Sequence, residues 1–118
     1  MSDWNTMPYE NLFAYQVAKE LLVVVSEAKI ADPRLRDQAL RAAKSVCLNI
    51  AEATGRQTPA DQKRVYAIAR GELSEAVAAM EVACAVGDCS LEAAATAHAA
   101  GLKLHALLCG LLRRQTAD

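Results

Sequence analysis

Aromatic residues are scarce in this chain, where they make up 4% of the 118 residues. Strands are enriched in aromatic and β-branched side chains, so this scarcity argues against an all-β fold. Alanine, the best helix former, fills 25 positions. At 53% hydrophobic residues, a chain of this length can bury one core and has little room for a second. The composition therefore predicts a single all-α domain over residues 1–118.

Glycine and proline are also few, with five and three residues, and half of these eight stand at breaks in the apolar pattern. Asp32 and Thr58 each precede a proline, which is typical of a helix start. Gly55 and Gly87 are typical of the residue after a helix end. The predicted helices span roughly residues 9–31, 34–54, 59–86 and 91–114. Because their connections are short, the sequence predicts an up-down-up-down antiparallel four-helix bundle.

The chain has no stretch of 18 uninterrupted apolar residues, and its first residues lack the basic and apolar regions of a secretion signal. We therefore expect a cytoplasmic protein without membrane contact. In that compartment the four cysteines are expected to remain reduced.

The chain as a whole has almost no excess charge. Its net charge of −1 excludes a strongly basic protein that coats nucleic acid. The distribution is uneven, however, since residues 34–70 hold eight basic and three acidic residues, a net charge of +5. Such a band is a candidate site for RNA or an acidic protein, although solvated charges paired with neighbouring acids would look the same. Its candidate contacts are Arg34, Arg41, Lys44, Arg56, Lys63, Arg64 and Arg70.

Catalytic and cofactor motifs are also missing, including Gly-rich phosphate loops, G-x-S-x-G and H-E-x-x-H. We therefore expect a protein that is not an enzyme and that has no cofactor, no resident metal and no small-molecule substrate. A metal-binding bundle is the less favoured alternative. Its ligands would be His98, His105 and Cys109, which fall on one helix face.

Small and apolar residues occupy the side of the third predicted helix opposite its core stripe, and the fourth predicted helix carries a second apolar face. Solvated helix backs are normally charged, so this pattern predicts an interface between copies of the chain. The candidate interface residues are Ala67, Gly71, Ser74, Ala78, Val82, Ala85 and Leu102.

Three segments carry a family resemblance. Residues 38–56, QALRAAKSVCLNIAEATGR, resemble the R-A-A-x-S-I-x-x-N-I-A-E-G-x-G-R signature of bacterial four-helix proteins first noticed in intervening sequences of 23S rRNA genes. Residues 9–18 are similar to the start of that family, and residues 66–76 to its I-A-x-G-S-L-x-E-L segment. The chain departs from the family pattern at Ala53, where glycine is usual, and at Cys47, where proline is common.

The resemblance implies a homo-oligomer, typically a pentameric barrel of four-helix subunits, without enzymatic activity. The family includes the accessory variability determinants of diversity-generating retroelements, which bind a reverse transcriptase and its RNA. The resemblance therefore implies RNA and a reverse transcriptase as partners. A protein interaction scaffold that does not bind nucleic acid is the alternative.

A polar seam follows one edge of the second predicted helix, between its apolar stripe and its basic face. Glu52 and Arg56 stand four residues apart in the order that favours a local ion pair. The alternative is that the seam bonds another helix or subunit. The seam residues are Gln38, Ser45, Asn49 and Glu52.

Overall fold

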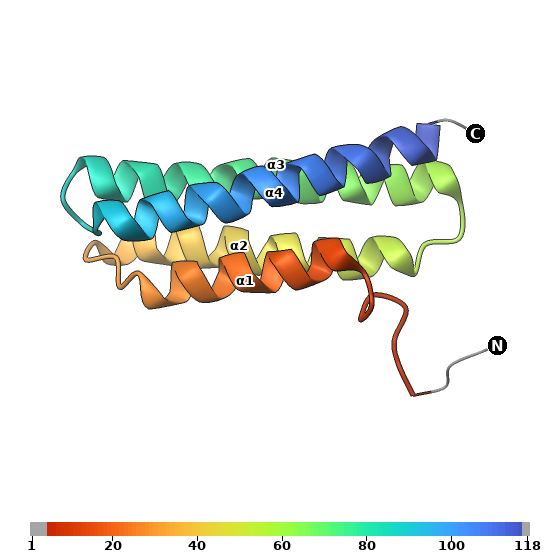
Figure 1. Ribbon diagram of the computed structural model, residues 1–118, viewed down its shortest axis with the longest axis horizontal. Helices are drawn as coiled ribbons and strands as arrows, with labels where there is room; N and C mark the ends of the chain where they lie inside the picture. The colour runs from red at the N-terminus through yellow and green to blue at the C-terminus, as the bar shows by residue number, and fades with distance from the viewer. Residues whose placement is uncertain (1–4, 117–118) are drawn as a thin grey trace.

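The computed structural model describes residues 5–116, which contain four helices and no strand (Figure 1). The helices are α1 (Phe13–Glu27), α2 (Pro33–Thr54), α3 (Pro59–Ala85) and α4 (Leu91–Thr116). The described chain is thus all-α, and it forms an elongated helical bundle of 49 × 30 × 21 Å.

Side-chain caps fix the start of three helices. The Asp32 carboxylate accepts a hydrogen bond from the Arg34 backbone N–H at 3.1 Å, and the Thr58 hydroxyl accepts one from the Asp61 N–H at 3.1 Å. Ser90 caps α4 in the same way, through the Ala93 N–H at 3.0 Å. Each cap satisfies a backbone donor that has no partner within its helix. The predicted starts of these helices lie within one residue of the observed ones.

The prediction for the first helix was wrong at both ends, since residues 9–31 were expected and Phe13–Glu27 is helical. Leu12, at the start, has an extended backbone and no side chain that can cap the helix. Beyond the end, Lys29 has a φ of 53°, a left-handed conformation that stops a helix. Ile30 nevertheless remains buried, so its apolar character reflects packing of the connection. The other predicted ends differ by one or two residues: α2 begins at 33, α3 ends at 85, and α4 ends at 116.

The helices are arranged so that α2 packs on α3, α3 on α4, and α1 on both α2 and α4. In Figure 1 the α1–α2 and α3–α4 connections lie at one end of the bundle. The α2–α3 connection, the start of α1 and the end of α4 lie at the other end. The two connections at the first end are tied together, because the Ala31 N–H donates to the Asp88 carbonyl oxygen at 3.1 Å.

Small side chains from α2 and α3 fill much of the core. Larger apolar side chains, such as Leu21, Met80 and Leu104, fill the remaining space. No polar or charged side chain is buried among the residues with described burial. Because alanine allows helix backbones to approach closely, the abundance of this residue determines how tightly α2 and α3 pack. Buried alanines of these two helices include Ala39, Ala42, Ala43, Ala53, Ala69, Ala76 and Ala83.

Candidate interaction surfaces

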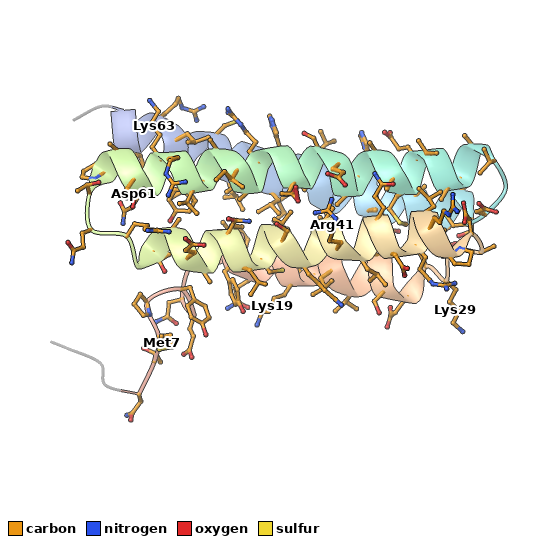
Figure 2. All side chains as sticks on the ribbon, turned by 180° about the vertical axis from the view of Figure 1, so that it is seen from behind. Met7, Lys19, Lys29, Arg41, Asp61 and Lys63 are labelled. Atoms are coloured by element: carbon orange, nitrogen blue, oxygen red, sulfur yellow. The ribbon has the colours of Figure 1, made fainter. Side chains whose placement is uncertain are left out.

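Arg41, one of the arginines of the basic band, joins α2 to α3. Its guanidinium forms ion pairs with Glu72 at 3.3 Å and Glu75 at 2.5 Å, and Gln38 also donates to Glu75 at 3.4 Å. The hydrogen bond to Glu75 is the main cause that raises the pKa of Arg41 above its ordinary value. Figure 2 shows Arg41 where α2 and α3 run side by side. Two carboxylates therefore compensate the charge of Arg41 within the chain.

A second ionic cluster lies at the corner between α2 and α3. Arg56 pairs with Glu52, one turn earlier, and with Asp61 at 3.4 Å. Asp61 also pairs with Arg64 at 2.9 Å. The hydrogen bond to Glu52 is the largest cause that raises the pKa of Arg56. The Gln62 amide donates to the Arg56 carbonyl oxygen at 3.3 Å, so the cluster ties the connection to α3.

Of the seven predicted contacts, three remain exposed cations without an ion pair in the described part of the chain: Arg34, Lys44 and Lys63. Arg34 lies in the first turn of α2, Lys44 in the middle of α2, and Lys63 at the start of the second turn of α3. The last of the seven, Arg70, is half-buried. The band predicted from the linear sequence is therefore divided in space between paired arginines and separated free cations.

Glu72 and Glu75 were missed as partners because they lie just outside residues 34–70, the segment over which charge was counted. Glu72 and Glu75 lie two and five residues after Arg70 in the chain, and both bond Arg41 on α2. Their spacing of three residues on α3 was the available signal, because it places both on one helix face.

The polar seam on α2 does not act as one continuous unit. Asn49 donates from its amide to the Ser45 carbonyl oxygen at 2.9 Å and to the Ser45 hydroxyl at 3.0 Å. Glu52 forms the local pair with Arg56. Among the bonds of the described residues, Gln38 is the seam member that reaches another helix, through Glu75 on α3. Two of the seam contacts are thus local to α2, and one crosses between helices.

A second surface covers the outer sides of α3 and α4, and we call it the α3/α4 face. Its predicted members are all exposed, and Val82 and Leu102 expose 52% and 60% of their surface. The face comprises Ala67, Gly71, Ser74, Ala78, Val82, Ala85 and Leu102, with His98 and His105 between the helices.

Two hollows lie along this face, in the groove between α3 and α4. One, of about 260 Å³, is lined by Ser74, Ala78, Leu102 and neighbouring side chains. The other, of about 470 Å³, is lined by Ala85, Leu91 and others, and Glu81 and His98 line both hollows. Exposed leucines thus stand beside apolar hollows on the same face.

Two helix glycines of this region differ in their surroundings. A Cβ atom at Gly101 would lie 2.6 Å from Val77 Cγ2, so the α3–α4 packing requires glycine there. A Cβ at Gly71 would meet no atom within 4 Å. Contacts within the chain therefore explain Gly101 and leave Gly71 unexplained.

The three predicted metal ligands are brought together only in part. The Cys109 sulfur lies 3.8 Å from His105 Nδ1 and 3.6 Å from Arg70 Nη1, and a guanidinium next to the sulfur disfavours a cation. Within the described residues, no three His, Cys, Asp or Glu side chains are grouped closely enough to hold a metal ion. His98 shares one hollow with His105 and also lines the next hollow, beside Glu81 and Cys84. The geometry therefore gives the metal hypothesis no third ligand.

The remaining thiols include two in unreactive surroundings. Burial raises the pKa of the Cys47 thiol above its ordinary value, and burial is also the main cause that raises the pKa of Cys89. A higher pKa leaves less thiolate, the form that attacks electrophiles and binds metals.

One helix, over Leu91–Arg114 of α4, is long and apolar enough to cross a membrane by length and composition. The core helix of a soluble protein passes the same test, so a single such helix is weak evidence for a span. Only 28% of its most apolar window is buried inside the bundle. The helix thus has more apolar surface than the packing of one chain covers.

Comparison with known proteins gives one family match, which covers most of the chain. A search of curated proteins found no match. The family model described as 23S rRNA-intervening sequence protein matches residues 10–109, which include all of α1, α2 and α3 and most of α4. The four-helix architecture, the polar edge of α2 and this match over most of the chain lead to one assignment: the protein belongs to the 23S rRNA-intervening sequence protein family.

Proposed function

We propose that this protein is a non-catalytic, cytoplasmic scaffold in which up-down-up-down bundles assemble with copies of themselves through the α3/α4 face. The resemblance to pentameric relatives makes a five-membered barrel the expected assembly. The observation that carries the proposal is Gly71, which lies at an exposed position in the middle of α3, where no contact in the described chain requires glycine.

Glycine inside a helix is costly, because it destabilises the helix by about 1 kcal/mol relative to alanine. Gly101 offsets this cost by allowing α3 and α4 to pack together. A neighbouring subunit packed against Gly71 would provide the same compensation, because a helix without a side chain at one point allows another backbone to approach closely.

The shape of the face favours a second copy of the chain as its occupant. Leu102 and Val82 project from the face, and the hollows beside them are lined by small and apolar side chains. A surface that carries both projections and apolar hollows can pack against another copy of itself. Glu81 is the one carboxylate that lines the hollows, so few charges would lose water on assembly.

Light scattering coupled to size-exclusion chromatography tests the assembly. A pentamer of 12.6 kDa subunits has a mass of about 63 kDa. An assembly of another closed number would support the interface and correct the subunit count. A particle of one subunit at micromolar concentration would overturn the proposal.

A second candidate function adds RNA as a partner, together with a reverse transcriptase, as the resemblance implies. The supporting observation is that Arg34, Lys44 and Lys63 are exposed and carry no ion pair in the described chain. Repetition around an assembly would multiply these three charges. The paired state of Arg41, Arg56 and Arg64 argues for modest phosphate affinity, since binding RNA would require them to exchange partners.

The alternative partner is a protein, and one residue favours it. Leu48 lies on α2, one turn after Lys44, and exposes 70% of its surface. An apolar side chain among free charges is typical of a contact with another protein. Dependence of binding on salt distinguishes the two partners, because phosphate contacts release counterions.

A further inference from the structure

We propose that pH controls assembly through the α3/α4 face, with His105 as the main switch and His98 as a weaker one. This inference rests on the proposed function and concerns regulation of the same interface. The chain contains two histidines, and both line the hollow between α3 and α4. Any subunit that fills this hollow covers both imidazole rings.

The two rings are exposed in the single chain, where water can solvate an added proton. Histidine is the side chain that ordinarily changes charge between pH 5 and 8. A charged imidazole enclosed in an apolar interface loses that solvation, which disfavours the assembled state. A neutral imidazole is accommodated at much lower cost.

The surroundings of His105 oppose a second positive charge. Its ring contacts the Cys109 sulfur at 3.8 Å, and the same sulfur accepts from the Arg70 guanidinium at 3.6 Å. Arg70 comes from α3 and carries no ion pair in the described chain, so its charge is not compensated there. A protonated His105 would thus be enclosed with a neighbouring guanidinium.

The surroundings of His98 differ. Glu81 of α3 lines both hollows that His98 lines, and Cys84 of α3 lines one of them, whereas His105 shares a single hollow with Glu81. The Glu81 carboxylate can compensate part of the charge on a protonated His98. The charge on His98 therefore opposes assembly less strongly than the charge on His105.

Linkage gives the direction of the effect. If assembly keeps an imidazole neutral, the assembled state binds fewer protons than the separate subunits, so the association constant falls as the pH falls. Each ring that stays neutral on assembly contributes its own factor to this fall. Because every subunit contributes its own rings, the effect on a ring-shaped assembly is the product of these factors.

Sedimentation velocity of the full chain at pH 7.5 and 5.5, over a range of concentrations, tests the switch. We expect assembly to require a higher protein concentration at pH 5.5 than at pH 7.5. Circular dichroism should show the same helix content at both pH values. Asparagine keeps polarity and similar size without titrating, so His105→Asn should remove most of the pH response and His98→Asn a smaller part. The double variant should assemble equally at both values.

The outcomes separate the two proposals. An assembly at pH 7.5 whose association constant is the same at pH 5.5, or a double variant that retains the wild-type response, overturns the switch and leaves the scaffold intact. A monomer at both pH values overturns the proposed function and the switch with it. Equal responses of the two single variants would overturn the assignment of His105 as the main switch.

Discussion

Gly101 on α4 packs so closely against Val77 on α3 that a Cβ atom at position 101 would lie 2.6 Å from Val77 Cγ2. Valine is stiff in a helix, because its branched side chain has one strongly preferred rotamer. The contact therefore fixes how near the two helices approach. It also sets the width of the groove in which both histidines lie.

Replacing Gly101 with alanine should destabilise the fold. Overpacking of this kind costs about 1–3 kcal/mol, which outweighs the gain in helix propensity. Gly110→Ala on the same helix is the matched control, since its nearest neighbour would be Arg113 Nη2 at 3.9 Å. Urea unfolding should show Gly101→Ala to be the less stable variant, and equal stability would contradict the packing argument.

Replacing Ala78 with glutamate should break the assembly and leave the helices intact. Ala78 is exposed in the chain and lines the hollow of the α3/α4 face, so the new charge would be enclosed only after association. A buried unpaired charge costs several kcal/mol. Leu48→Glu adds the same charge on α2 and should leave the assembly unchanged. Light scattering and circular dichroism measure both effects, and an intact Ala78→Glu assembly would place the interface elsewhere.

Alkaline pH should destabilise the folded chain through Cys47 and Tyr66. Burial raises the pKa of both groups above their ordinary values of 9.0 and 10.0. Each group ionises more readily in the unfolded chain, so its contribution is fully present below the ordinary pKa and is lost as the pH rises above it. The free energy of unfolding, measured by urea between pH 8 and 10.5, should decline for the wild type.

The variants Cys47→Val and Tyr66→Phe remove one ionisable group each and nearly keep its shape. Each should flatten the alkaline decline, whatever its effect on stability at pH 8. A decline that runs parallel to the wild type in both variants would show that other groups control the alkaline limb.

RNA binding, if present, should depend on salt and on the three unpaired cations. The logarithm of the RNA affinity should fall linearly with the logarithm of salt concentration. Neutralising Arg34, Lys44 and Lys63 together with glutamine should reduce the slope by about 3 if each contacts a phosphate. The control variant, Lys19→Gln with Lys29→Gln, removes two exposed cations of the first helix region and should change the slope little. Absence of RNA binding by the wild type at about 50 mM salt would leave a protein as the partner.

How far the sequence alone predicts the fold depends on local chemistry. The starts of α2 and α3 were predictable because Asp32 and Thr58 cap them through residues two and three positions away. The ends of α1 were not, because the apolar pattern continues through Ile30 while the backbone turns at Lys29. Periodicity reports burial, and burial can continue after a helix has ended.

The sequence by itself determined the helical class, the number of helices and the presence of a small, apolar side on α3, because these follow from spacing along one chain. Only the tertiary structure decided which arginines remain free. Glu72 and Glu75 are more than 30 residues from Arg41 in sequence but hold it at 3.3 and 2.5 Å. The tertiary structure also distinguished the two glycines. Close packing against Val77 leaves no room for a Cβ atom at Gly101, whereas no atom of the described chain lies near a Cβ atom at Gly71. Charge compensation and close packing are distances between segments, and such distances exist only after the helices have packed.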